Sequence, residues 1–166
     1  MTIRLVLLRH AKAERGADDE QRVLTEDGKA AARAIGRWLG EQSLVPDHVV
    51  LSPARRAVQT WELAAQTGGA SDPDLDPRMY QNTVDSLLAV IRDTPPQAQT
   101  LVLVGHNPSI QDLAAELDDG RGDDTQRAGM SRKFPTAAAA VFEFGADWAD
   151  SDRGTGSLIA FSGSPD

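Results

Sequence analysis

Three short apolar runs, each followed by a segment with helical periodicity, are the feature that most constrains the fold. The runs cover residues 3–8, 48–52 and 100–105. Apolar runs of this length between proline and polar residues are typical of buried β-strands. Strands that alternate with helices form a layered α/β protein with a largely parallel sheet. The sequence therefore predicts this fold class.

The segments between the runs predict the remaining elements. Apolar residues recur with the period of a helix over roughly 26–42, from about 54, and over 83–93. Another helix is expected to follow, with Pro108 in its first turn and Asn107 as its cap. Two more strands, which would add an antiparallel edge, are expected at 137–144 and 157–162, joined by a turn-rich connection. The polar, glycine-rich stretches 67–77 and 118–135 are expected to be loops.

Length and composition limit the kind of protein. The chain has 166 residues, 40% of them hydrophobic, so we expect one domain over residues 1–166. A net charge of −8 disfavours nucleic acids and anionic membranes as partners. The absence of cysteine excludes disulfides, thiolate metal sites and a cysteine nucleophile. The first apolar run is too short for a signal peptide or a membrane span, so a cytoplasmic location is expected.

Unusual polar side chains follow all three predicted strands. In an open α/β sheet, the carboxyl ends of parallel strands meet at one edge, and ligands bind there. Two of the chain's three histidines and up to three arginines are expected at this edge. In chain order these residues are Arg9, His10, Arg55, Arg56 and His106, with Asn107 beside the last histidine.

Each of these features also has an ordinary structural interpretation when it is taken alone. The arginine–histidine pair after the first strand could be a surface exit, and the arginine pair could be solvated. His106 could be a helix cap, and His48 is interpreted as a surface residue. Cations are disfavoured near a helix N-terminus, however, which makes the arginine pair unusual. The shared placement at strand ends therefore favours a functional site.

Together these residue types suit phosphoryl transfer without a metal. Guanidinium groups bind phosphate oxygens bidentately, and a neutral imidazole can attack phosphorus to form a covalent intermediate. A second, protonated imidazole and helix-end amides can hold the remaining oxygens. The parts for a P-loop, a G-x-S-x-G elbow or a cysteine phosphatase are not in the sequence. His10 and Glu14 alone do not complete a metal site.

Four ordered motifs resemble the histidine phosphatase superfamily, which includes the cofactor-dependent phosphoglycerate mutases. They are LRHAKAE (8–14), LTEDG (24–28), SPARRAVQT (52–60) and VGHNPSI (104–110). The short chain, RHAKAE in place of Arg-His-Gly, and KFPTAA (133–138) resemble its small SixA-type branch, the phosphohistidine phosphatases. The resemblance runs from residue 3 to about residue 140. It implies a three-layer α/β/α sandwich with a mostly parallel central sheet, as in phosphoglycerate mutases.

The resemblance also implies a role for each matching residue, with no metal and no organic cofactor. Its candidates are His10 as the nucleophile that becomes phosphorylated, Arg9 and Arg56 as phosphate ligands, His106 as the second phosphate-binding histidine, and Asn107 with its amide close by. Arg55 takes a variable position in the motif and is expected to face solvent or the rim of the pocket.

The acid that protonates the leaving oxygen in the larger phosphatases and mutases has no glutamate counterpart in residues 78–85. Asp18, Asp19 and Glu20 in the first loop are the candidates, and Asp18 is taken first. Imidazole leaves phosphorus with less help than an alkoxide does. We therefore expect a phosphatase whose partner is a protein carrying phosphohistidine. The alternatives are a small phosphate ester as substrate, a mutase-like transferase, and a catalytically weak phosphate-binding module.

Overall fold

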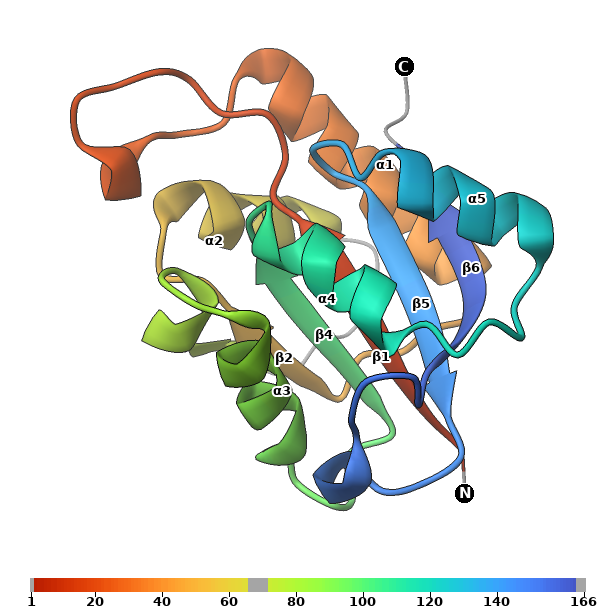
Figure 1. Ribbon diagram of the computed structural model, residues 1–166. Helices are drawn as coiled ribbons and strands as arrows, with labels where there is room; N and C mark the ends of the chain where they lie inside the picture. The colour runs from red at the N-terminus through yellow and green to blue at the C-terminus, as the bar shows by residue number, and fades with distance from the viewer. Residues whose placement is uncertain (1, 66–71, 164–166) are drawn as a thin grey trace.

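A six-stranded sheet forms the middle layer of the protein (Figure 1). The structure is a computed structural model that describes residues 2–65 and 72–163. Its strands are β1 (Ile3–Arg9), β2 (His48–Leu51), β3 (Asp74–Leu75), β4 (Thr100–Gly105), β5 (Ala139–Phe144) and β6 (Ser157–Ser162). They lie in the order β3-β2-β4-β1-β5-β6. The first four are parallel, β5 is antiparallel to β1, and β6 is antiparallel to β5, which confirms the predicted fold class.

Helices cover both faces of the sheet (Figure 1). One face packs against α1 (Glu26–Glu41) and α2 (Arg55–Ala64), and the other against α3 (Val84–Arg92) and α4 (Ser109–Leu117). A further helix, α5 (Asp124–Arg132), lies beside β6 and α4, and short 3-10 turns occupy Asp19–Gln21, Pro77–Met79 and Trp148–Asp150. Among the described residues, no helix is long and apolar enough to cross a membrane.

Strand β1 shows why the central strands appear in the sequence as unbroken runs of apolar residues. Leu5 and Leu7 pack with the α3 and α4 side, whereas Val6 and Leu8 pack with the α1 and α2 side. All four have no exposed surface. Because successive side chains of a strand face opposite layers, a strand covered on both faces needs apolar residues at every position. Each such burial stabilises the fold by roughly 1.5–3 kcal/mol.

Two glycines allow α1 to approach its neighbours closely. A Cβ atom on Gly28 would lie 2.1 Å from the Lys12 carbonyl oxygen, and one on Gly36 would lie 2.3 Å from the Ala64 carbonyl oxygen. Thr25 caps the helix, since its side chain accepts a hydrogen bond from the Gly28 N–H at 3.0 Å. The LTEDG motif thus fixes the start of α1 directly against the loop that follows β1.

The predicted loop over 118–135 is wrong, because it contains α5. This nine-residue helix buries one of its residues, Met130, so its apolar periodicity is too weak to predict it. Its start depends on a polar cap instead. The Asp123 side chain accepts a hydrogen bond from the Gln126 N–H at 3.0 Å.

Two smaller predictions also need correction. The predicted loop over 67–77 holds β3, a strand of two exposed residues, while residues 67–71 lie outside the described part of the chain. Helix α4 begins at Ser109, with Pro108 rather than Asn107 at the N-cap position. Asn107 still supports the first turn, since its Oδ1 accepts a hydrogen bond from the Gln111 N–H at 3.2 Å.

Candidate active site

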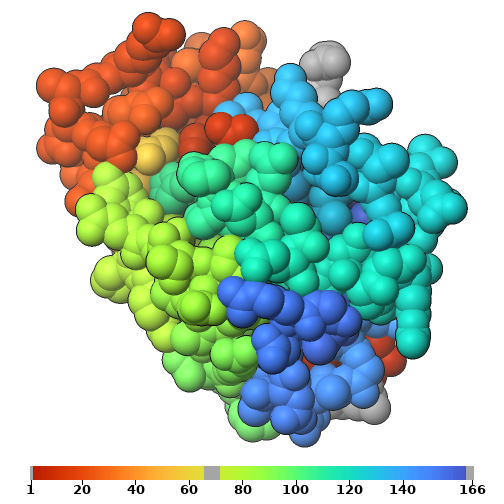
Figure 2. All heavy atoms as spheres, viewed as in Figure 1, coloured from red at the N-terminus to blue at the C-terminus, as the bar shows by residue number. Residues whose placement is uncertain are grey.

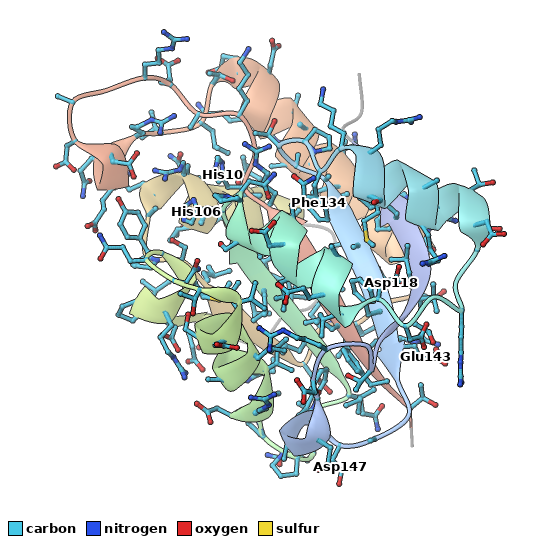
Figure 3. All side chains as sticks on the ribbon, in the orientation of Figure 1. His10, His106, Asp118, Phe134, Glu143 and Asp147 are labelled. Atoms are coloured by element: carbon cyan, nitrogen blue, oxygen red, sulfur yellow. The ribbon has the colours of Figure 1, made fainter. Side chains whose placement is uncertain are left out.

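The carboxyl ends of β1 and β4 place two histidines side by side. Arg9 and Gly105 are paired in register, and the His10 N–H donates to the Gly105 carbonyl oxygen at 3.0 Å. His10 and His106 therefore leave neighbouring strands at the same level, and their ring centroids are 5.1 Å apart. Figure 3 shows both rings together at one end of the sheet. The predicted convergence of strand ends thus brings these residues into contact.

His10 is held as a neutral imidazole with one ring nitrogen available. Its Nδ1 lies 2.7 Å from the Ala11 carbonyl oxygen, and because a carbonyl only accepts, Nδ1 carries the proton. Burial, which leaves the residue 8% exposed, lowers the pKa of His10 to about 3. The hydrogen bond to Ala11 opposes this shift, and the charges of His106, Arg56 and Arg9 add to it. The Nε2 lone pair is therefore free for nucleophilic attack.

Thr60 fixes the peptide that orients His10. The Ala11 N–H donates to Thr60 Oγ1 at 2.9 Å, and this hydroxyl donates to the Arg56 carbonyl oxygen at 2.6 Å. Its neighbour Gln59 accepts a hydrogen bond through Oε1 from the Leu24 N–H of the first loop at 2.9 Å. The end of the SPARRAVQT motif therefore ties α2 to that loop. The motif was recognised in the sequence, but the role of Thr60 in it was not.

Arg9 and Arg56 are each anchored by a backbone carbonyl. Arg9 Nη1 donates to the Phe134 oxygen at 3.1 Å, and Arg56 Nη1 donates to the Asp19 oxygen at 2.7 Å. The Nε atoms of both arginines are buried and have no hydrogen-bond partner within the described part of the chain. Burial lowers the pKa of Arg9. Unpaired buried donors are costly, and guanidinium groups suit phosphate oxygens, so these Nε atoms are candidate phosphate donors.

His106 faces the same edge from β4. Its Nε2 lies 2.7 Å from Ser52 Oγ, its buried Nδ1 has no partner among the described residues, and the Tyr80 ring meets it edge-on at 5.6 Å. Burial and the charge of Arg56 lower the pKa of His106 to about 4. The charges of the protein itself therefore do not favour the protonated form of His106 that was expected. A bound dianion would favour the protonated form.

The segment that contains Phe134 closes the site from the side of β5. The Phe134 carbonyl oxygen accepts hydrogen bonds from Arg9 and, at 2.9 Å, from Asn107 Nδ2. The Ala137 N–H donates to the carbonyl oxygens of Arg9 and His10 at 3.1 Å each. Figure 3 shows Phe134 near the two histidines. The KFPTAA motif thus holds the ends of β1 and β4 in place, and Asn107 contributes through its side chain.

The first loop brings Asp19, rather than Asp18, to the predicted residues. Asp19 Oδ2 accepts hydrogen bonds from Arg56 Nη2 at 3.1 Å and from the Tyr80 hydroxyl at 2.5 Å, while Oδ1 accepts from Arg22 Nη1 at 3.0 Å. The Tyr80 hydroxyl and the two arginines hold the pKa of Asp19 well below its usual range. In Figure 2 the orange atoms of this loop lie beside the yellow-green atoms around residue 80. Asp18 is exposed, and its assignment as the acid stays a prediction.

The two arginines at the start of α2 differ in their exposure to solvent. Arg56 is 6% exposed, whereas Arg55 is exposed to solvent at the start of α2. The two residues therefore point to different environments although they are adjacent in the chain. The exposure of Arg55 matches the expectation that it faces solvent, whereas phosphate binding by Arg56 stays a prediction.

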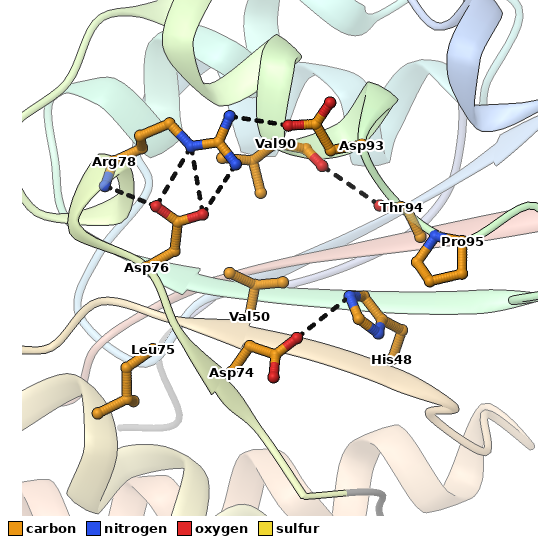
Figure 4. A pocket seen from close by; sticks show the side chains of 10 residues that line it. All are labelled: His48, Val50, Asp74, Leu75, Asp76, Arg78, Val90, Asp93, Thr94 and Pro95. Atoms are coloured by element: carbon orange, nitrogen blue, oxygen red, sulfur yellow. Dashed lines mark hydrogen bonds and ion pairs between the residues drawn. The ribbon is translucent and has the colours of Figure 1, made fainter.

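A pocket of about 300 Å³ lies away from these residues, between β2, β3 and α3 (Figure 4). Its polar side chains are paired with one another: His48 Nε2 lies 3.8 Å from Asp74 Oδ2, and Arg78 is bound by Asp76 and Asp93. The residues lining it are His48, Val50, Asp74, Leu75, Asp76, Arg78, Val90, Asp93, Thr94 and Pro95. In residues 2–65 and 72–163, no group of three or more His, Cys, Asp or Glu side chains could hold a metal ion.

Comparisons with known proteins identify the family of the chain. The sequence profile of the histidine phosphatase superfamily (branch 1) matches residues 5–83, which carry the first three motifs. The uncharacterized protein Rv1276c of Mycobacterium tuberculosis is 33% identical over 157 residues, which is 93% of this chain and 98% of the relative.

Two solved structures extend the likeness to the whole fold. The protein from Nakamurella multipartitia, provisionally described as the phosphohistidine phosphatase SixA, is 29% identical, with a TM-score of 0.85 over 99% of this chain and 97% of that chain. The Agrobacterium tumefaciens protein of the same provisional description is also 29% identical, with a TM-score of 0.80 over 96% and 97%. The chain belongs to the histidine phosphatase superfamily, in its SixA-type branch. It is accordingly a hydrolase of the phosphatase class.

Proposed function

We propose that the protein removes the phosphoryl group from phosphohistidine on a partner protein, without a metal, through a phosphohistidine intermediate on His10. The observation that most supports this proposal is the protonation state of the His10 ring. Its Nδ1 proton is held by the Ala11 carbonyl at 2.7 Å, and burial lowers the pKa of the ring to about 3. The ring is therefore a ready nucleophile at neutral pH, with two arginines beside it.

The reaction has two steps. The lone pair of His10 Nε2 forms a new N–P bond while the bond from phosphorus to the leaving group breaks, and its electron pair goes with the leaving group. Arg9 and Arg56 hold the phosphoryl oxygens through their unpaired Nε donors, and His106 becomes the third ligand once the dianion raises its pKa. Water then attacks the phosphorus, His10 leaves, and inorganic phosphate is released.

The acidic residue at this site supports a nitrogen–phosphorus substrate. Asp19 is kept ionised by Tyr80, Arg22 and Arg56, so it has no proton to give to an alkoxide. An imidazole leaves phosphorus without that proton transfer. The two similar structures that carry the provisional name phosphohistidine phosphatase support the same substrate class.

The test compares leaving groups. We expect kcat/KM on a protein carrying phosphohistidine to exceed that on an alkyl phosphate such as glycerol phosphate by at least about a hundredfold, the usual contribution of a general acid. EDTA should leave both values unchanged, because arginines rather than a metal neutralise the phosphoryl group. Equal values for the two substrates would show a competent acid and would favour the alternative, a small-molecule phosphomonoesterase or a mutase-like enzyme.

A further inference from the structure

The Asp19 carboxylate has one acceptor position left at the mouth of the site. Its Oδ2 accepts from Arg56 and Tyr80, and its Oδ1 accepts from Arg22. A carboxylate oxygen can accept two hydrogen bonds, so Oδ1 has room for another donor. The side chain is 51% exposed, in contrast to the 7% of the Arg56 side chain that it binds. The carboxylate that binds Arg56 is therefore open to solvent, whereas the Arg56 side chain is not.

Asp19 borders the site on the side of His106. The Tyr80 hydroxyl donates to Asp19 Oδ2 at 2.5 Å, and the Tyr80 ring packs edge-on against the His106 ring, with centroids 5.6 Å apart. Asp19 Oδ2 also accepts from Arg56 Nη2 at 3.1 Å, and Arg56 is the proposed phosphate ligand. In an in-line displacement the leaving group departs opposite the attacking nitrogen. A leaving group that departs toward solvent beside Arg56 meets this exposed carboxylate.

We propose that Asp19 is a specificity-determining residue that binds the protonated far nitrogen of the leaving imidazole ring. This inference rests on the proposed function. The ring of a phosphohistidine substrate is bonded to phosphorus through one nitrogen, and its other nitrogen can carry a proton. That N–H donates to Asp19 Oδ1, beside the bond from Arg22.

The proton on the far nitrogen makes the ring a neutral leaving group. When His10 Nε2 forms its bond to phosphorus, the bond from phosphorus to the substrate ring breaks, and the electron pair returns to that ring nitrogen. The ring leaves as neutral imidazole, because the far nitrogen keeps its proton throughout. Without this proton the ring would have to leave as an anion.

The local charges explain why a carboxylate is needed for this purpose. Arg56 and Arg22 both bind Asp19, and their charges and that of Arg9 act on the neighbouring His106, so a positively charged substrate ring would be repelled by them. Ionised Asp19 offsets this repulsion for a cationic ring. It repels a substrate that carries a further negative charge near its phosphate. The same side chain therefore selects for phosphorylated imidazole and against acidic sugar-phosphate-like esters.

The decisive experiment measures the ratio of kcat/KM on N-phosphoimidazole to kcat/KM on p-nitrophenyl phosphate. Asp19→Asn keeps an oxygen acceptor but loses the charge, and the ratio should fall about tenfold, the weight of one charge-assisted hydrogen bond. If Asp19 served only to orient Arg56, both substrates would lose activity alike and the ratio would stay constant, which would overturn the inference. Glu20→Gln, which removes a charge from the same exposed turn, is the matched control and should keep the wild-type ratio.

The pH dependence of kcat provides a second test, because it would not change if Asp19 had only a structural role. The pH dependence of kcat reports groups in the enzyme–substrate complex. For N-phosphoimidazole, the alkaline limb of kcat should lie about one pH unit lower in Asp19→Asn than in the wild type, because the carboxylate no longer keeps the ring protonated. The limb should not shift for p-nitrophenyl phosphate. An unshifted limb on N-phosphoimidazole contradicts the proposed contact.

Inhibition by imidazole tests the proposal on the wild-type protein alone. Imidazole is mainly a cation at about pH 6 and neutral at about pH 8, so it should inhibit p-nitrophenyl phosphate hydrolysis at a lower concentration at pH 6. Equal inhibition at both pH values counts against the proposal.

If the wild type does not turn over N-phosphoimidazole, the proposed function fails and this inference fails with it. If the wild type does turn over N-phosphoimidazole but Asp19→Asn leaves the ratio of kcat/KM values unchanged, only the inference fails.

Discussion

Acid should destabilise this protein through the two histidines of the site, and the size of the effect follows from their pKa values. The unfolded chain protonates a histidine near pH 6.5, whereas the folded values are about 3 for His10 and about 4 for His106. Between these limits the unfolded state binds more protons than the folded state. Stability is therefore fully present above about pH 6.5 and is lost as the pH falls below it.

The loss amounts to about 1.4 kcal/mol per pH unit for each ring whose folded pKa has not been reached. At pH 5, about 1.5 units below the unfolded value, each histidine should cost about 2 kcal/mol of unfolding free energy relative to pH 8. Together they cost about 4 kcal/mol, which is between about a quarter and four fifths of the roughly 5–15 kcal/mol by which native domains are typically stable.

Urea denaturation at pH 8 and pH 5 measures this quantity. His10→Gln and His106→Gln should each remove about half of the pH-dependent loss, and the double variant should remove most of it. Comparison among the four proteins cancels the carboxylates, which are common to all. A pH dependence that stays the same in the double variant would refute the reasoning, because the two rings would then not be buried in their neutral form.

Three further substitutions test particular contacts. Thr60→Val should lower kcat more than it changes KM and should cost about 1–3 kcal/mol of stability in urea denaturation, because it leaves the buried Ala11 N–H without a partner; Thr60→Ser should restore both. Gly28→Ala should destabilise by at least about 1–3 kcal/mol, whereas Gly40→Ala, with nothing within 4 Å of the new Cβ, should stabilise by up to about 1 kcal/mol. Arg56→Lys should raise KM for p-nitrophenyl phosphate by about tenfold or more through loss of the planar fork, while exposed Arg55→Lys should leave it unchanged.

The placement of the central residues could be predicted because strong local signals surround them. Strand β1 is covered on both faces and so reads as an unbroken apolar run that ends at Arg9. The parallel order then requires that strand ends share an edge. The exact pairing of β1 with β4, which places His10 next to His106, is a matter of register and could not be read from either strand alone.

The residues that complete the site could not be found in this way. Tyr80 and Asp19 are 61 positions apart, and neither lies at the end of a buried strand. Their contact depends on how the first loop folds over α2, a long-range arrangement without a periodic signal. The search for an acid considered Asp18 first, because the three acidic residues of that loop look alike in sequence. Helix α5 was missed for a related reason, since a single buried residue gives it no apolar stripe.

The most direct test of the account is the chemical identity of the intermediate. Wild-type protein mixed with a radiolabelled phosphoryl donor and quenched within one turnover should carry an acid-labile, base-stable phosphate on His10. His10→Ala should carry no label and should not turn over, while its circular dichroism spectrum matches that of the wild type, because a side chain at a strand exit adds little to the core. Continued turnover by His10→Ala would contradict the account.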